Sequence, residues 1–363
     1  MRITEATLFH IAIPCTPFET SFGTIRIRPA LIVCLKTDSG YVGYGESSLL
    51  YEPLSEREVV TDGVRMLSQK LSELIGTEVT DSDDILNTLE KDFPITTFAI
   101  EAAYTDLLAK QEKISLATYF GANRKTVLAG ESIGLQGGIE GMLTEMKRYV
   151  DDGITRIKIK IKPGSDRELL EAARAAHPTI ELGADANAAY APSDLPLLQS
   201  LQEFNLTFIE QPFAAEDLES HRVLNEATPV CLDESVVDEA SCKRSIELRA
   251  CSMINIKPAR IGSFRASKRI HDMCVEAGIG LFGGGRLETG VGKTMNVAFY
   301  ALPGFTHASD ITPPDQYLKR DIALPAFKIA NGMYTLPDEV GSGISLDHET
   351  LEEFLVETIS FTS

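Results

Sequence analysis

Short segments near the start of the chain alternate polar and apolar residues, which is the pattern of strands with one buried face. We expect strands at residues 2–13, 29–36 and 41–46. Two later stretches carry apolar residues at helical spacing, at 56–75 and 81–110. Pro94 is expected to divide the second stretch into two helices, because proline lacks the backbone N–H that a helix interior needs. Roughly the first 120 residues are therefore predicted to form a small α+β unit.

The pattern then changes to short β-branched runs that alternate with amphipathic stretches. Strands are expected at 126–132, 155–160, 180–185, 206–210, 230–233, 253–257 and 279–283. Helical patterns follow most of them, at 138–152, 166–177, 192–204 and 262–277. The repeat of about 25 residues, with no glycine-rich dinucleotide loop after its first strand, favours a closed barrel of parallel strands over an open sheet. From about residue 310 the periodicity fades, and 341–355 is expected to return to the N-terminal unit.

The charge balance changes what the molecule is expected to bind. Among 363 residues, 34 Lys and Arg stand against 53 Asp and Glu, a formal net charge of −19 that repels nucleic acid and anionic membranes. Six scattered cysteines form no CxxC pair or His/Cys cluster, which favours reduced thiols over a zinc site or disulfide framework. The first 15 residues lack the continuous apolar segment of a leader, and no apolar run is long enough to cross a bilayer. We therefore expect a cytoplasmic protein.

Charged residues end four successive predicted strands, each about one strand–helix unit apart. They are Asp185, Glu210, Asp233 and Lys257. Residues that end neighbouring barrel strands meet at one rim, where three carboxylates would repel one another without a cation. An all-oxygen site with one carboxylate per strand suits Mg²⁺, with Mn²⁺ as the alternative ion. Any one of these acids could instead cap the following helix, but independent caps need not share one spacing.

One unit upstream, lysine and isoleucine alternate along a predicted strand. Lys158 and Lys160 fall on one face, and the isoleucines fall on the other. A half-exposed strand with lysines in water is one interpretation. In a barrel, however, the outer face must be apolar to meet the helices, so the lysines would point inward. A neighbouring lysine and a bound cation both disfavour the ammonium form of Lys160, which suits it as a base.

These segments together resemble the enolase superfamily, in its muconate-lactonizing subgroup. The motifs are KIK at 158–160, DAN at 185–187, IEQP at 209–212, LDES at 232–235 and NIKP at 255–258. Within the subgroup, the chain resembles the family of o-succinylbenzoate synthases and N-succinylamino acid racemases, through 16–29, 156–164, 185–190, 288–293 and 302–311. The resemblance implies an α/β fold with a (β/α)₇β modified TIM barrel at 123–310. An N-terminal α+β capping domain at 1–122 would cover the barrel, and the C-terminal segment 311–363 would complete the cap.

The resemblance also implies roles for particular residues. Asp185, Glu210 and Asp233 match the Mg²⁺ ligands, and Lys160 and Lys257 match the acid/base pair. Candidates for substrate contacts are Ser132, Lys158, Asn187, Gly285 and Leu287 in the barrel, and Phe18, Phe22 and Tyr51 in the cap segments that close over the substrate. The three aromatic residues could equally be core residues of the cap.

Arg286 departs from the family pattern, which usually has a methionine after paired glycines. A guanidinium just past the seventh barrel strand could bind a distal substrate carboxylate through two hydrogen bonds. It could also pair with Glu288 or another acid, because a buried arginine needs a partner. In either role, Arg286 weakens the inference that this chain acts on the usual substrate of the family.

The residue set predicts a Mg²⁺-dependent enzyme that removes the proton α to a carboxylate through an enediolate. Two lysines on opposite faces would racemise that carbon, whereas loss of a β-hydroxyl would make Lys160 the base and then the acid of a syn dehydration. The leading hypothesis is an o-succinylbenzoate synthase, an N-succinylamino acid racemase, or both. A dipeptide epimerase or cycloisomerase is the alternative, for which Arg286 is the reason. A non-catalytic barrel is less favoured, because such a protein would be expected to have lost one of the two lysines or one of the metal ligands. We expect a small carboxylate substrate, no nucleic-acid or membrane partner, and a homo-oligomer.

Overall fold

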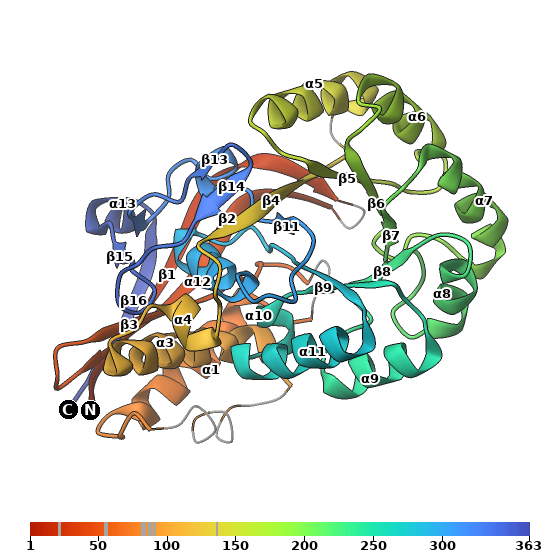
Figure 1. The fold of residues 1–363 in the computed structure, drawn as a ribbon. Coiled ribbons are helices and arrows are strands. Elements are labelled where there is room, and N and C mark those ends of the chain that lie inside the picture. Colours follow the sequence, from red (N-terminus) through yellow and green to blue (C-terminus); the bar gives the residue numbers. More distant parts are fainter. Residues whose placement is uncertain (21–22, 54–56, 81–84, 86–88, 90–91, 136) are drawn as a thin grey trace.

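The fold is described from a computed structural model, which covers residues 1–363 apart from 21–22, 54–56, 81–84, 86–88, 90–91 and 136. An antiparallel sheet with its helices forms one side of the molecule (Figure 1). Parallel strands surrounded by helices form the other side. In the described part of the chain, no helix combines the length and the apolar character needed to span a membrane.

The N-terminal unit is built on a four-stranded antiparallel sheet in the order β16-β1-β2-β3. Its strands are β1 (Ile3–Thr20), β2 (Gly23–Thr37), β3 (Val42–Ser47) and β16 (Leu355–Thr362). Its helices are α1 (Val60–Leu74), α3 (Pro94–Glu112) and α4 (Leu116–Phe120). Gly43 and Gly45 of β3 let α3 approach closely, since a Cβ at Gly45 would collide with the carbonyl of Ala99.

The predicted strands and helices of this unit are present, with different limits. Strands β1 and β2 form one hairpin that is longer than expected, because it continues past the buried sheet into residues with little alternation. Helix α3 begins at Pro94, as predicted, where proline at the first helical position leaves no intrahelical hydrogen bond unmade. Most of the residues expected to be helical before Pro94 lie outside the described residues.

The second unit contains parallel strands that pair in sequence order from β4 to β10. These strands are β4 (Thr126–Ile133), β5 (Arg156–Lys160), β6 (Glu181–Asp185), β7 (Phe208–Glu210), β8 (Val230–Leu232), β9 (Met253–Ile256) and β10 (Gly280–Gly283). An eighth short strand, β11 (Ser309–Asp310), pairs in parallel with β4, and a bridge between Leu281 and Phe305 joins the residues before it to β10. The chain thus turns back from β10 toward β4, and the predicted barrel-like arrangement of seven strands plus one is confirmed.

Helices surround these strands on the outside (Figure 1). They are α5 (Gly138–Asp151), α6 (Arg167–Ala176), α7 (Leu195–Ser200), α8 (Leu218–Asn225), α9 (Glu239–Leu248), α10 (Pro258–Ile261), α11 (Phe264–Ala277) and α12 (Gly290–Tyr300). The single helix expected at 192–204 was wrong in detail. Two 3₁₀ turns, η1 (Pro192–Asp194) and η2 (Leu201–Phe204), flank the short α7. Pro192 begins η1 and Pro196 lies in the first turn of α7, and neither has a backbone N–H to donate.

The C-terminal segment returns to the N-terminal unit, as expected. Gly341 N donates to Ile114 O at 2.8 Å, and β16 pairs antiparallel with β1 until Ser363 N donates to Thr4 O at 3.1 Å. Short elements lie between, namely η3 (Pro314–Gln316), β12 (Ala323–Leu324), β13 (Ile329–Ala330), β14 (Met333–Thr335), β15 (Ser345–Leu346) and α13 (His348–Glu353). Strand β14 also pairs antiparallel with β4. This pairing was not predicted, because strands of two or three residues are too short to show an alternating pattern in the sequence. The domain limits 1–122, 123–310 and 311–363 stay predictions.

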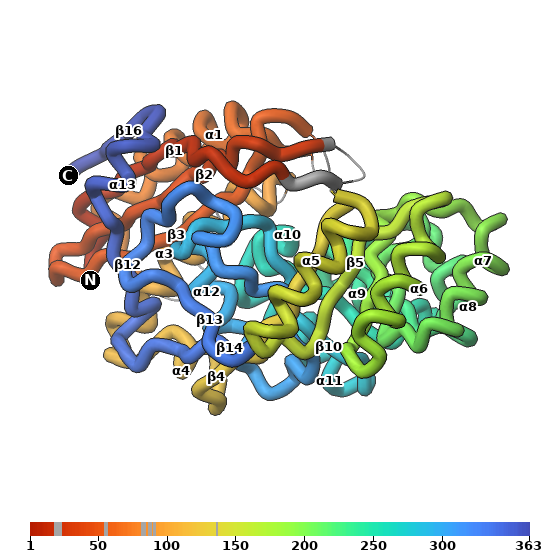
Figure 2. Tube along the Cα trace, turned by 90° about the horizontal axis from the view of Figure 1, so that it is seen from above, coloured from red at the N-terminus to blue at the C-terminus, as the bar shows by residue number. Residues whose placement is uncertain are grey.

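Buried polar side chains of the N-terminal unit hold the segment that follows β10. Arg28 of β2 donates from Nε to Leu287 O at 2.8 Å and from Nη1 to Leu49 O at 2.7 Å. Glu46 of β3 accepts from Thr289 N at 3.0 Å and Gly292 N at 2.9 Å, where the first N–H groups of α12 have no helical partner. Figure 2 shows the N-terminal strands on one side of the molecule and helices α6 to α8 at the opposite end. These contacts therefore hold the segment after β10 against the N-terminal unit.

Candidate active site

Strand β5 places basic side chains on the inner face of the barrel. Lys158 is 2% exposed and Lys160 is partly exposed, while Ile157 and Ile159 are buried in the hydrophobic cluster on the other face. This is the alternation expected of a strand that is covered by helices outside and by polar groups inside. Below the lysines, the barrel interior is filled by an apolar layer of Phe208, Cys231, Met253 and Phe282.

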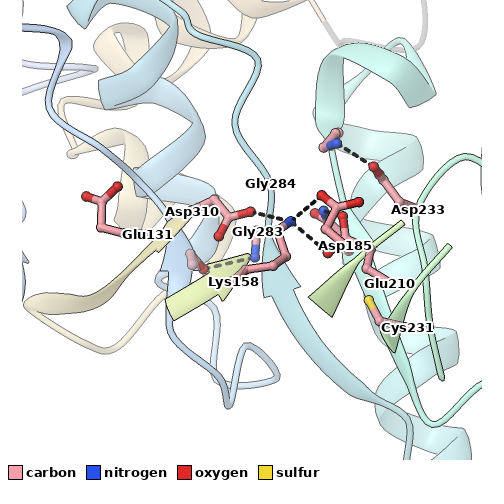
Figure 3. A network of polar contacts seen from close by, with 12 residues as sticks. Glu131, Lys158, Asp185, Glu210, Cys231, Asp233, Gly283, Gly284 and Asp310 are labelled. Carbon is pink, nitrogen blue, oxygen red and sulfur yellow. Dashed lines mark hydrogen bonds and ion pairs between the residues drawn. The ribbon is translucent and has the colours of Figure 1, made fainter. Parts of the chain in front are cut away.

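Lys158 lies among three carboxylates that come from three different strands. Its Nζ is 2.7 Å from Glu210 Oε2, 3.2 Å from Asp185 Oδ2 and 3.0 Å from Asp310 Oδ2. Figure 3 shows Asp310 on one side of the ammonium group, with Asp185 and Glu210 on the other. Lys160 lies at the same level, because its Cα pairs with that of Asp185, and Asp185 pairs with Glu210 in turn. Two of the predicted metal ligands thus meet at one cationic atom.

Asp233 and Lys257 come directly after strands β8 and β9 and contact each other. Lys257 Nζ is 2.5 Å from Asp233 Oδ2, and Arg260 Nη1 binds the other oxygen, Oδ1. The Lys160 ammonium forms a similar pair, 2.7 Å from Asp185 Oδ2, and also contacts Asn187 Oδ1. Each of the two predicted acid/base lysines therefore binds one of the predicted metal ligands.

Burial and ion pairing act in opposite directions on these groups. Burial raises the pKa of Glu210 to about 7, in spite of Lys158. Burial also opposes the charge of Asp233, but Arg260 and Lys257 hold its pKa below the usual value. Lys158 is equally buried, yet Asp310, Glu210 and Asp185 raise its pKa well above the usual value. Each buried charge in the cluster is therefore stabilised only while its oppositely charged partner is present.

The donor set suits a hard divalent cation. Asp185, Glu210 and Asp233 offer carboxylate oxygens from adjacent strands, and Asp185 and Glu210 already converge on one positive charge. Nearby, Glu234 Oε2 is buried and lacks a hydrogen-bond partner. In the described part of the chain, no group of three His, Cys, Asp or Glu side chains is arranged to hold a metal ion. Lysines and Arg260 bind the carboxylate oxygens of Asp185 and Asp233 instead. A metal ion would therefore have to take over some of these ion pairs.

A cavity of about 200 Å³ opens above the cluster. The predicted site residues that line it are Ser132, Lys158, Lys160, Asp185, Lys257, Gly285 and Leu287. Thr16 and Pro17 of β1 also line the cavity, so the N-terminal unit forms part of its wall. Glu210 and Asp233 are 0% and 1% exposed and contact the lining residues Lys158 and Lys257. Both lysines proposed for proton transfer thus line the same cavity.

The other predicted substrate contacts lie in different surroundings. Asn187 Nδ2 donates to Glu234 Oε1 at 3.1 Å, so this side chain links Lys160 to the neighbouring loop. Tyr51 is 45% exposed, and its hydroxyl lies 3.2 Å from His10 Nε2. Phe18 belongs to β1, but its side chain lies outside the described part, and Phe22 lies outside the described residues altogether. Their roles as substrate contacts stay predictions.

Arg286 contacts the N-terminal unit. Its Nε donates to Ser48 Oγ at 3.2 Å, while its neighbours Gly285 and Leu287 line the cavity. Glu288 is instead paired with Lys293, at 3.0 Å between Oε2 and Nζ. Pairing of Arg286 with an acid and binding of Arg286 to a substrate carboxylate both stay predictions.

Several site residues did not stand out in the sequence. Lys293, Asp310, Thr312 and Tyr317 line the cavity, and Arg148 and Tyr149 reach it from α5. Asp310 lies within a segment that supports the family resemblance, and Arg260 follows Lys257 by one helical turn, so both had a weak signal. Arg148 and Tyr149 had none, because they look like ordinary residues of an amphipathic helix.

Comparisons with known proteins agree with this geometry. Residues 3–121 match the family model "Mandelate racemase / muconate lactonizing enzyme, N-terminal domain", and residues 141–350 match "Enolase C-terminal domain-like". The chain is 35% identical to an o-succinylbenzoate synthase of Bacillus subtilis, over 100% of this chain and 99% of that protein. It is 37% identical to an N-succinylamino acid racemase of Thermus thermophilus, over 95% of each. A crystal structure of an enolase superfamily member from Listeria innocua superposes with a TM-score of 0.92 at 31% identity, covering 100% of this chain and 99% of that one. The chain therefore belongs to the enolase superfamily, among the proteins that combine the mandelate racemase and muconate lactonizing enzyme domains.

Proposed function

We propose that the protein is a Mg²⁺-dependent enzyme that removes the proton α to a substrate carboxylate. The reaction we favour is that of an o-succinylbenzoate synthase, an N-succinylamino acid racemase, or both, as the names of its relatives suggest. One observation carries the proposal. Lys160 at the end of β5 and Lys257 after β9 line one cavity, from strands separated by β6, β7 and β8.

Asp185, Glu210 and Asp233 are the residues that would hold the metal ion. Enolase-type sites generally combine a lysine or histidine base with Mg²⁺, and a bound Mg²⁺ supplies Lewis-acid stabilisation of the charge that develops on the substrate carboxylate. Such a carbon acid is very weak, so this electrostatic contribution must be large.

The two lysines would carry the proton. Lys160, neutral at Nζ, would take the α-proton on one face of the substrate, and Lys257, charged at Nζ, would return a proton on the other. Asn187 Oδ1 contacts Lys160 Nζ and would help to orient the side chain, which limits the cost of positioning the base. In a dehydration, Lys160 would first accept the proton and then protonate the leaving hydroxyl, while Lys257 would remain charged against the intermediate.

A dipeptide epimerase or cycloisomerase is the alternative function, for which Arg286 is the reason. The Nε of Arg286 contacts Ser48 of the N-terminal unit. The protein carries a net charge of −19, and acidic residues also line the cavity, but its lysines supply positive charge for an anionic substrate. Assembly as a homo-oligomer stays a prediction.

The proposal is tested by ¹H NMR in D₂O with Mg²⁺. N-succinylamino acids, dipeptides and the cyclohexadiene precursor of o-succinylbenzoate are offered in parallel, and α-proton exchange or dehydration is followed. We expect turnover of the succinyl compounds and little of the dipeptides. Turnover of dipeptides alone would assign the epimerase, and turnover of none would overturn the proposed reaction.

A further inference from the structure

We propose that Lys293 determines substrate specificity by binding the second carboxylate of a dicarboxylate substrate. This inference rests on the proposed function, which places the reacting carbon at Lys160 and Lys257. Lys293 belongs to the segment ETGVGK, which has no role in the proposed proton transfer.

The position of Lys293 meets the geometric requirement. It lies in the first turns of α12, is 3% exposed, and lines the same cavity as the two proton-transfer lysines. The Lys293 ammonium group lies close to Gly285, which follows β10, since a Cβ added at Gly285 would be 3.0 Å from Lys293 Nζ. The same Cβ would be 2.9 Å from the carbonyl oxygen of Asp310 in β11, so Lys293 lies near the ends of both strands. Lys160 reaches the cavity from β5, which is separated from β11 by β4. A ligand that fills the cavity can therefore meet both lysines.

Lys293 pairs with a carboxylate outside the proposed metal ligands, whereas Lys160 and Lys257 each pair with one of those ligands. Among the described residues, Glu288 is the one carboxylate within 4.0 Å of its Nζ, at 3.0 Å from Oε2. The remaining oxygen of Glu288 accepts from Asn296 Nδ2 at 3.0 Å. An ammonium group has three N–H donors, so one ion pair leaves it donors for a ligand. Lys158, by contrast, already lies among three carboxylates.

Glu288 keeps this cation in place without belonging to the catalytic cluster. Burial opposes its ionisation, but Lys293 lowers its pKa, so the carboxylate stays charged. A buried neutral pair of this kind adds little to stability, because desolvation offsets the attraction. Its placement on a cavity wall favours a role in ligand binding. Ser132 lines the same cavity, and its hydroxyl group is a further polar group there.

Substrate chemistry supplies the reason for a second cation. A succinyl group carries a carboxylate at the end remote from the reacting carbon, and burying that charge unpaired would be costly. A charged hydrogen bond in a buried site changes affinity by roughly 10- to 100-fold. An N-butyrylamino acid keeps the four-carbon acyl chain but lacks the two carboxylate oxygens, so comparison of the two compounds reports the contribution of the second carboxylate.

The test uses the full-length protein with Mg²⁺ and the variant Lys293→Met/Glu288→Gln, which removes both charges and leaves no unpaired carboxylate. Lys110→Met/Asp106→Asn is the matched control, because it removes another largely buried ion pair, in the N-terminal unit. N-succinylvaline and N-butyrylvaline are compared by isothermal titration for binding and by α-proton exchange for turnover. The wild type and the control are expected to prefer the succinyl compound.

The site variant should lose about 10- to 100-fold in affinity and kcat/KM for N-succinylvaline, with N-butyrylvaline changed by less than about threefold. An unchanged succinyl preference, or an equal loss for both compounds, would overturn the role of Lys293. If neither compound turns over in the wild type but succinyl binding still depends on Lys293, the proposed reaction fails and the assignment of Lys293 stands.

Discussion

Lys158 Nζ lies 2.7 Å from Glu210 Oε2, and both side chains are almost completely buried. An ion pair in such a place is stable only while both partners are present, since removing one leaves a charge without solvent or partner. Asp185 and Asp310 add further negative charge around the same ammonium group. Lys158 therefore occupies a position where positive charge is required.

Lys158→Met should destabilise the metal-free protein by about 3–5 kcal/mol, because three carboxylates lose their common partner. Added Mg²⁺ should restore part of that loss by supplying charge to Asp185 and Glu210. The measurement is the free energy of unfolding from urea titrations with and without Mg²⁺. The exposed Lys147→Met, which removes a surface pair with Asp151, should change little. A variant at Lys158 as stable as wild type without Mg²⁺ would contradict the prediction.

Mg²⁺ should stabilise the wild type by about 2.7 kcal/mol at a concentration 100 times its dissociation constant, because it binds the folded state alone. Asp185→Asn and Asp233→Asn should lose this effect. Asp310→Asn is the matched control, since Asp310 also contacts Lys158 but is not among the proposed ligands. Thermal unfolding with Mg²⁺ and with EDTA measures the difference. Equal stabilisation in all three variants would remove the metal site from these residues.

Glu46 should make stability depend on pH. Burial raises its pKa to about 7 from an ordinary value of 4.5, so the folded state keeps its proton over a range where the unfolded state has lost it. The free energy of unfolding should therefore fall as pH rises from about 4.5 to 7 and then level off, by an amount on the order of 3 kcal/mol. Glu46→Gln should lack this component, which urea titrations across this pH range would show. The exposed Glu276→Gln should instead follow the wild-type curve.

Arg28→Met should affect both stability and substrate binding. The change removes donors from two carbonyls, Leu287 O and Leu49 O, at a cost of about 1–3 kcal/mol for each group left buried without a partner. Leu287 has a φ of 56°, a left-handed conformation that a non-glycine residue keeps only when its surroundings hold it. Because Leu287 lines the cavity, KM should rise. Steady-state kinetics beside urea unfolding would separate the effects, and an unchanged KM would contradict the positioning role.

The sequence was most informative where the fold repeats. Lys160, Asp185 and Glu210 end successive strands in direct register, so their spacing along the chain predicts their meeting in space. Spacing along the chain does not predict the positions of residues outside the repeat. Asp310 reaches Lys158 from a two-residue strand, and Lys293 reaches the cavity from a helix that is buried on all sides. Neither has a periodic signal, because tertiary packing alone decides their neighbours.

The central claim is that two lysines act on opposite faces of one carbon. It is tested most directly by following α-proton exchange of each enantiomer of an N-succinylamino acid in D₂O with Mg²⁺, in Lys160→Met and Lys257→Met. The account predicts that both variants lose racemisation and that each exchanges the proton of one enantiomer, opposite in the two variants, because each keeps a single lysine facing the cavity. Racemisation in either variant, or exchange of the same enantiomer in both, would contradict it.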